Sequence, residues 1–218
     1  MEEKNIHDDL AAIRSVMERS SKFISLSGLS GVLAGIYALL GAWGAYYFVY
    51  GHGRARPYYA VDSSNLTDGG LRFTYIYNGE ILFLLLIAVL VLLASIITGY
   101  ILTKRKAKRK GQAIWGRISR SLLFYMAVPL ISGGGLILVL IYRGVYDIIA
   151  PASLIFYGLS LVSASNFTFT LVKYLGLCEI VLGLIAACLP GYGLLFWAIG
   201  FGVLHIIYGS LMYLRYDK

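Results

Sequence analysis

Charged residues are scarce in this chain. They make up 14% of the 218 residues, against about 25% in an ordinary soluble protein. Hydrophobic residues reach 59%, and the mean hydropathy is +0.75. Too little polar surface remains to cover so much apolar surface, so the composition excludes a soluble fold of one large or two small domains. It indicates a polytopic membrane protein.

Residues and motifs that hold metals or nucleotides are also few. The two cysteines, Cys178 and Cys188, lie ten residues apart in one apolar stretch, where core packing is favoured over a disulfide or a metal pair. The three histidines are scattered along the chain. The sequence has no Walker loop, dinucleotide fingerprint, His-x-x-x-His pair or serine elbow. We therefore expect no metal and no cofactor, and the residues argue against an enzyme without excluding one.

Six apolar stretches are long enough to cross a bilayer, which takes about 20 residues of helix. They predict a single transmembrane domain over 23–214, with spans at 23–50, 81–103, 121–142, 151–168, 169–189 and 194–214. Two longer connections separate these spans: an outer loop at 51–79 and a basic cytoplasmic loop at 104–120. The predicted fold class is all-α, a polytopic bundle of six transmembrane helices.

Lysine and arginine are divided unevenly between the two sides of this bundle. With the N-terminus in the cytoplasm, fifteen of them fall on the cytoplasmic side and four on the outer side. Cytoplasmic loops of membrane proteins carry such an excess of positive charge. The pattern predicts that both ends of the chain are cytoplasmic.

Residues 1–22 predict a short amphipathic helix in front of the first span. Ile6, Leu10, Ile13 and Met17 recur at helical spacing and form one apolar stripe. Two interpretations are open. The stripe packs on the bundle or the membrane interface, or it forms a short coiled-coil seam between protomers.

A run of basic residues follows the second span. Its members are Lys104, Arg105, Lys106, Lys108, Arg109 and Lys110. Anionic lipid headgroups attract such residues by about 1 kcal/mol each near the membrane surface. The run predicts contact with these headgroups, or else serves only to fix topology. No nucleic-acid-reading fold accompanies it, so we expect no nucleic acid as partner.

Small residues recur every four positions in the first span, with Gly31 and Gly35 at its centre. This spacing lets two helix backbones approach closely in lipid. The sequence alone leaves two partners open, another helix of the same chain or the same face of a second copy in a homo-oligomer.

The third span contains Pro129 and then the run Ser132, Gly133, Gly134 and Gly135. Proline removes one backbone hydrogen bond, and each glycine lowers helix preference by about 1 kcal/mol relative to alanine. The segment predicts either a broken helix that builds a polar site or a kink that improves packing.

Serine and tyrosine share one face of the fourth span at Ser153, Tyr157 and Ser160. Polar groups on such a face join helices by hydrogen bonds or line an aqueous path. Both interpretations remain open at this point.

Glu179 and His205 are the acid and base placed well inside the predicted apolar core. They flank the turn at 190–193, and at about 1.5 Å of rise per residue they lie about 19 Å and about 20 Å from its midpoint. An antiparallel hairpin therefore sets them at the same depth. The pair predicts a proton-responsive site, or else a neutral hydrogen-bonded pair that fixes helix register.

Two segments carry a resemblance: SLSGLSGVLAGIYALLGA (25–42) and PGYGLLFWAIGFGVLHIIYG (190–209). They resemble an uncharacterised family of six-span bacterial membrane proteins, and the likeness covers most of the chain. It implies a bacterial inner membrane and six helices. It carries over no activity and no catalytic residue.

The leading hypothesis for function is a non-enzymatic membrane protein that passes or senses a small solute or proton through a polar centre at mid-membrane. The alternative is an accessory or scaffold protein whose interior polar groups are structural. A membrane-embedded enzyme is the third hypothesis.

Overall fold

The computed structural model describes residues 27–50, 78–109 and 115–216. All regular structure in these ranges is helical: α2 (Gly28–Tyr50), α3 (Asn78–Arg109), α4 (Arg117–Tyr142), α5 (Ile149–Ala164), η2 (Ser165–Phe167), α6 (Thr170–Cys188), α7 (Gly193–Trp197), η3 (Ala198–Leu204) and α8 (His205–Tyr216). The predicted helix at 1–22, most of the outer loop at 51–79, and Lys110 lie outside the described residues.

Six stretches of helix are long and apolar enough to cross a membrane, which confirms the predicted number. They are Gly28–Phe48, Leu82–Arg109, Arg117–Tyr142, Ile149–Phe167, Thr170–Cys188 and Gly193–Tyr216. The sixth is continuous in space but changes type, from α7 through the π-helix η3 to α8.

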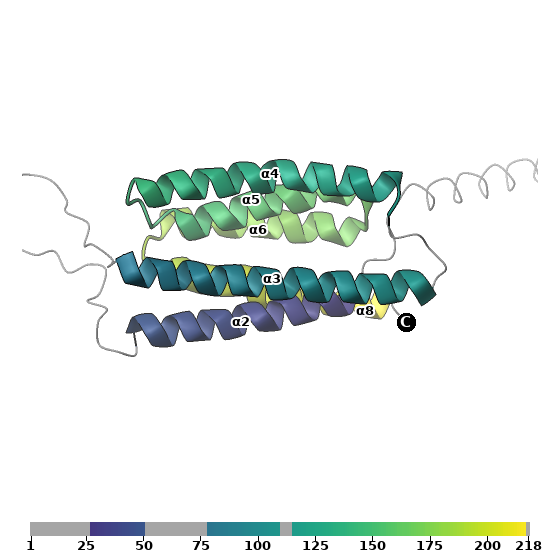
Figure 1. Cartoon of the computed structure of the whole chain (residues 1–218), viewed down its shortest axis with the longest axis horizontal. Helices are drawn as coiled ribbons and strands as arrows, with labels where there is room; N and C mark the ends of the chain where they lie inside the picture. The colour runs from purple at the N-terminus through teal and green to yellow at the C-terminus, as the bar shows by residue number, and fades with distance from the viewer. Residues whose placement is uncertain (1–26, 51–77, 110–114, 217–218) are drawn as a thin grey trace, which may run out of the picture.

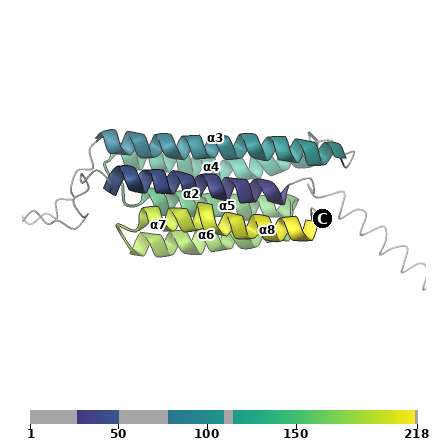
Figure 2. The ribbon, with the colours of Figure 1, turned by 90° about the horizontal axis from the view of Figure 1, so that it is seen from below.

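The six stretches stand side by side with their axes nearly parallel, and the described start of α2 lies at the same end of the bundle as the end of α8 (Figures 1 and 2). The helices are not equally enclosed. In the most apolar window of each helix, 39% of residues are buried in α5 and 33% in α6, but 6% in α4 and none in α3. Helices α3 and α4 therefore stand at the periphery.

The basic segment after the second span differs from prediction. Helix α3 continues through Arg109 instead of giving way to a loop at Lys104. Lysine, arginine and alanine are strong helix formers, and positive charge in a last turn interacts favourably with the helix dipole. The predicted loop at 104–120 is therefore wrong over 104–109 and again from 117, where α4 begins.

Glycines allow the inner helices to approach closely. A Cβ added to Gly158 of α5 would stand 2.6 Å from the Gly176 carbonyl oxygen of α6, and one added to Gly176 would stand 2.7 Å from the Gly158 oxygen. Neither position has room for a side chain, so the two backbones are in direct contact. This is how small residues promote helix association where the solvent is itself apolar.

The small-residue stripe of the first span packs within the chain. A Cβ on Gly31 would lie 3.1 Å from the Gly209 Cα in α8, and one on Gly35 would lie 2.6 Å from the Gly202 oxygen in η3. The chain's own sixth span therefore occupies this face. This packing favours the interpretation in which the partner is another helix of the same chain, and the homo-oligomer contact through Gly31 and Gly35 stays a prediction.

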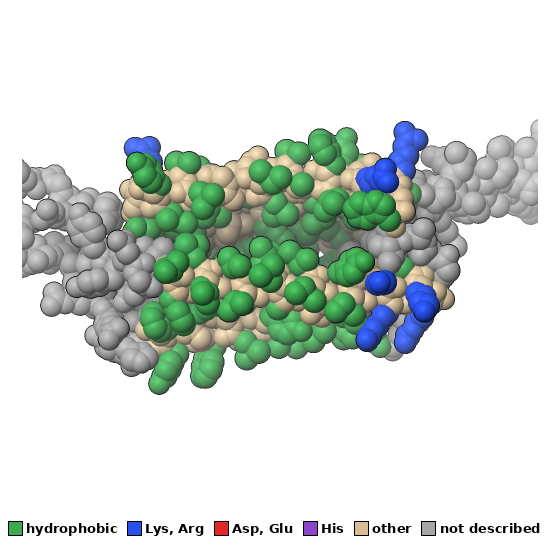
Figure 3. Space-filling view, in the orientation of Figure 1, with side chains coloured by type: hydrophobic (Ala, Val, Ile, Leu, Met, Phe, Trp, Pro, Cys, Tyr) green, Lys and Arg blue, Asp and Glu red, His purple; other side chains and the backbone are tan. Residues whose placement is uncertain are grey.

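One end of the bundle is strongly basic. Of the described lysines and arginines, one lies at the other end, Arg143 after α4, and nine lie here: Lys104, Arg105, Lys106, Lys108, Arg109, Arg117, Arg120, Lys173 and Arg215. Figure 3 shows basic side chains at this end, beyond the apolar middle of the face it displays. The first and last described residues lie at the basic end.

Candidate functional site

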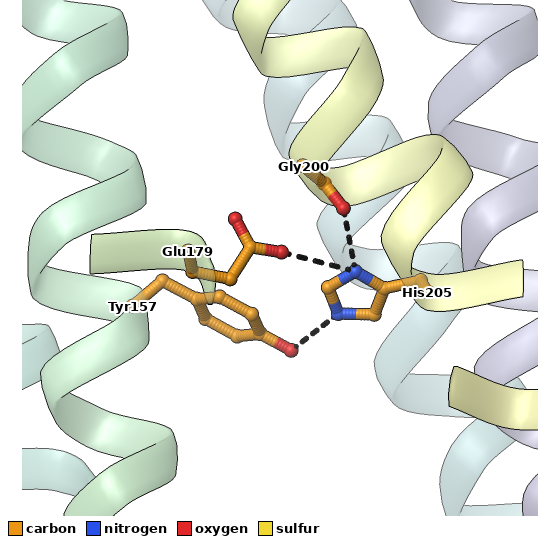
Figure 4. Close-up of polar contacts among 4 residues, drawn as sticks. All are labelled: Tyr157, Glu179, Gly200 and His205. Atoms are coloured by element: carbon orange, nitrogen blue, oxygen red, sulfur yellow. Dashed lines mark hydrogen bonds and ion pairs between the residues drawn. The ribbon is translucent and has the colours of Figure 1, made fainter. Parts of the chain in front are cut away.

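Glu179 of α6 and His205 of α8 meet inside the bundle, as their matched depth predicts. The Glu179 Oε1 atom lies 3.5 Å from His205 Nδ1 (Figure 4). Glu179 is 0% exposed and His205 is 6% exposed. A carboxyl and an imidazole thus share one enclosed space at the centre of an apolar bundle.

Tyr157 of α5 completes the cluster. Its hydroxyl lies 2.7 Å from His205 Nε2, on the side of the ring opposite the carboxyl (Figure 4). Phe201 packs against both rings, at 5.0 Å from the tyrosine centroid and 6.0 Å from the histidine centroid. The sequence places Tyr157 on a polar face but does not connect it to His205, because spacing along one helix does not show which helix that face will contact.

The hydrogen bonds of His205 fix its tautomer. Nδ1 lies 3.0 Å from the Gly200 carbonyl oxygen. Because a carbonyl oxygen only accepts, Nδ1 carries the hydrogen and donates it to Gly200. In the neutral ring Nε2 is then the acceptor, and the Tyr157 hydroxyl donates to it. Both nitrogens of the histidine are satisfied without Glu179.

The Glu179 carboxyl has no hydrogen-bond partner among the described atoms, on either oxygen. It is held in place by close packing. A Cβ added to Gly200 would stand 2.5 Å from Glu179 Oε2, 2.5 Å from Leu154 Cδ2 and 3.2 Å from Leu182 Cδ2. Only glycine at position 200 leaves room for the carboxyl, and an isolated charge there would be strongly unfavourable.

The backbone that presents His205 is irregular. The π-helix η3 ends at Leu204, and the His205 N–H bonds to the Gly202 oxygen instead of the oxygen four residues back that an α-helix would use. The Gly200 carbonyl oxygen accepts the hydrogen bond from Nδ1 of the His205 ring. π-Helical turns occur frequently at functional sites. The sequence does not predict this π-helix, for which the only local signal is the pair of glycines at 200 and 202.

The other members of the predicted polar face do not join the cluster. The Ser153 hydroxyl donates to the Ala150 oxygen in its own helix at 2.7 Å. Ser160 is 0% exposed, and its hydroxyl has no partner among the described atoms. Ser160 lies one helical turn after Tyr157. Of the three residues on the predicted polar face, Tyr157 is the one that joins the cluster.

The predicted break in the third span is wrong, because α4 runs without interruption from Arg117 to Tyr142 with Pro129 inside it. The Ser132 hydroxyl donates back to the Val128 oxygen at 2.8 Å. Proline and glycine are tolerated in membrane helices when neighbouring groups satisfy the freed backbone.

The three glycines of that run have separate roles. A Cβ on Gly133 would collide with Phe156 of α5, so this glycine permits close packing, whereas Gly134 and Gly135 have nothing within 4 Å of an added Cβ. None of the three lies in the cluster.

An open apolar groove of about 350 Å³ runs along α6 and the sixth span, next to the cluster. Its lining is Leu177, Cys178, Val181, Leu182, Ile185, Ile199 and Leu204. Leu182 also packs toward Gly200, so one layer of side chains separates the groove from the carboxyl.

The described residues contain no group of three metal-binding side chains. Cys178 and Cys188 are free and exposed. In the described part of the chain, the acid–base chemistry within the spans therefore centres on Tyr157, Glu179 and His205.

The fold defines the class of protein: an all-helical, multi-pass chain with six helices suited to cross a membrane. No protein-family model, curated protein or solved structure matches it. Its function must therefore be inferred from the cluster itself.

Proposed function

We propose that this chain is a non-enzymatic integral membrane protein that senses protons through the Tyr157–His205–Glu179 cluster. We further propose a bacterial inner membrane, with both ends of the chain in the cytoplasm. The basic end of the bundle supports this orientation, because it carries nine of the ten described lysines and arginines together with the first and last described residues.

The observation that carries the proposal is a fully buried carboxyl 3.5 Å from an imidazole, with no hydrogen bond of its own. Two arrangements keep the pair neutral overall. In one both groups are uncharged, and in the other a carboxylate faces an imidazolium. Gaining or losing a proton leaves one net charge in an apolar interior, which is strongly unfavourable unless the structure rearranges.

The rearrangement has a defined starting point at the Gly200 carbonyl. When the cluster loses its proton, the carboxylate competes with that carbonyl for the Nδ1 hydrogen of His205. Losing the ring hydrogen bond changes the bonding of a π-helix that already departs from α geometry. Helix η3 packs on α2 through Gly202 and Gly35, so we expect its movement to reach the first span.

The groups around the cluster favour Glu179 and His205 as the titrating pair. On α5 the facing group is Tyr157 and on α8 it is Tyr208, whose hydroxyl donates to Met212 Sδ. Where α2 meets η3, the residues in closest contact include Gly35 and Leu39, neither of which titrates.

Trp197 is a suitable reporter for the test, because it directly precedes η3 and its ring lies 5.2 Å from that of Phe201. Trp43→Phe and Trp115→Phe leave it as the single tryptophan. We expect its emission in proteoliposomes to change in one step when the pH is scanned across the range in which carboxyl and imidazole groups exchange protons, from about pH 4 to about pH 8. Glu179→Gln should abolish the step, and Asp147→Asn, which neutralises a carboxyl outside the spans, should retain it. Retention of the step in Glu179→Gln would refute the proposal.

A second candidate is an accessory protein in which the cluster only fixes helix register. The observation that favours it is the dry surrounding of the cluster, since Glu179 is 0% exposed and the adjacent groove is lined by apolar side chains. In that case Glu179→Gln lowers stability and Trp197 emission shows no pH-dependent step in either protein.

A further inference from the structure

The end of α3 extends beyond the apolar part of its span. Residues 82–103 alone rise about 33 Å, which already crosses a hydrocarbon core of about 30 Å. Helix α3 nevertheless continues through Arg109. The segment 104–109 therefore projects as ordered helix into the headgroup layer of the membrane.

The basic residues of this segment fall on two faces. Ala107 is 0% exposed, and the Lys106 ammonium lies 5.9 Å from the centre of the Phe169 ring, so this face docks on the end of the bundle. The opposite face is exposed and carries four positive charges, at Lys104, Arg105, Lys108 and Arg109. We call these four residues the cationic stripe. Figure 3 shows basic side chains projecting at this end of α3.

The cationic stripe continues two rows of lipid-facing apolar residues. One row reads Ile96, Tyr100, Lys104 and Lys108, and the other reads Ile97, Ile101, Arg105 and Arg109, each at four-residue helical spacing. The four apolar members are 42–58% exposed. A lipid whose acyl chain lies along either row therefore brings its phosphate to the stripe.

The described acidic residues leave the stripe uncompensated. Glu80 and Asp147 belong to segments at the opposite end of the bundle, and Glu179 is buried at its centre. Arginine binds phosphate through two parallel hydrogen bonds, and lysine adds a compact charge. The Lys104 ammonium lies 5.9 Å from the centre of the Tyr100 ring, one turn closer to the hydrocarbon.

We propose that the cationic stripe is a binding surface for anionic phospholipid headgroups, two rows wide, with acyl chains seated along the rows below it. This inference is independent of the proton-sensing proposal, because it uses a different end of the molecule. The proposal goes beyond a topology signal. A topology signal requires only that positive charges lie near the end of the span, whereas lipid binding also requires that they lie on one face of the helix.

The test measures lipid preference of the full-length protein in detergent by native mass spectrometry. Each basic group near an anionic surface contributes about a fivefold gain, so we expect phosphatidylglycerol to bind at least about tenfold more tightly than phosphatidylcholine. Lys104→Gln/Arg105→Gln/Lys108→Gln/Arg109→Gln should reduce that preference to about twofold or less. The matched control removes four charges from the same end but from other helices: Arg117→Gln/Arg120→Gln/Lys173→Gln/Arg215→Gln. It should keep the preference.

Equal losses in the two variants would overturn the proposal, because net charge alone would then explain binding. So would displacement of phosphatidylglycerol by inorganic phosphate at comparable concentration, which would identify a free phosphate site. Salt provides a check on the unaltered protein. Raising ionic strength from about 0.05 M to about 0.5 M should shrink the preference several-fold, and an unchanged preference would contradict it.

Discussion

Glu179→Met should leave the bundle as stable as before or make it more stable, although it removes a buried member of the central cluster. Methionine has nearly the length of glutamate and no group that needs a hydrogen bond. The two carboxyl oxygens it replaces are both buried and have no partner in the described structure. His205 keeps its bonds to Tyr157 and Gly200 in the variant.

The magnitude follows from these contacts. Removing an unsatisfied buried polar group recovers about 1–3 kcal/mol. Replacing buried ionic groups by apolar side chains of similar volume is neutral or stabilising by about 1–4 kcal/mol. We therefore expect the free energy of unfolding to rise by about 0–3 kcal/mol, since the larger sulfur atom offsets part of the gain by crowding Leu154 and Gly200.

The assay is reversible unfolding in mixed micelles, followed by loss of helical circular dichroism. A decrease in the free energy of unfolding of more than about 2 kcal/mol would refute the reasoning, because it would show that the carboxylate and imidazolium form a net stabilising pair. An unchanged midpoint with an altered slope would indicate a changed unfolded state and calls for a second probe.

The remaining predictions use the same assay. Tyr157→Phe should lower the free energy of unfolding by about 1–3 kcal/mol, because it leaves His205 Nε2 buried without a hydrogen-bond donor. The control Tyr142→Phe, at a residue that is 92% exposed, should change the free energy of unfolding by less than about 0.5 kcal/mol. Similar values for the two variants would contradict the Tyr157 hydrogen bond. Gly200→Ala should cost about 1–3 kcal/mol by displacing the carboxyl, while Gly134→Ala, with open space around it, should be neutral or stabilising. Burial raises the pKa of Asp147 in the folded protein above its ordinary value of about 3.9. The free energy of unfolding should therefore fall as pH rises from about 3.9 through the higher pKa of the folded state. Asp147→Asn should remove this pH dependence, and a dependence that persists in the variant would show that another group causes it.

The sequence predicts the helices well because each depends on its own residues. Long apolar runs define the six spans, and a glycine with positive φ follows two of them, α4 and α6. Gly144 has a φ of +70° and closes α4 with the Gly144 N–H on the Ile141 oxygen and the Val145 N–H on the Leu140 oxygen. The end of α3 differs from the prediction because positive charge marks the limit of the hydrocarbon core, not the limit of the helix.

The site is predicted only in part, because it depends on which helices become neighbours. Depth alone predicts the pairing of Glu179 with His205, since one short turn joins their spans. Tyr157 lies on a helix whose neighbours no spacing rule fixes, and the Gly35 stripe fits a second copy as well as the chain's own sixth span. The π-helix has a weaker signal still, because an extra residue shifts the helical phase and a span that is apolar around most of its circumference does not reveal the shift.

The division of hydrogen bonds within the cluster bears on the choice between a cluster that only fixes helix register and one that senses protons. A cluster that fixes register needs every buried polar group to be hydrogen-bonded, since each unsatisfied group destabilises the packed state. His205 meets that condition through Tyr157 and Gly200, and the bond from Tyr157 joins α5 to the sixth span. Glu179 adds no hydrogen bond and a strongly unfavourable charge whenever it ionises. A carboxyl that does not serve the packed state supports the proposed second state, in which the carboxylate takes the Nδ1 hydrogen of His205 and the Gly200 carbonyl loses it.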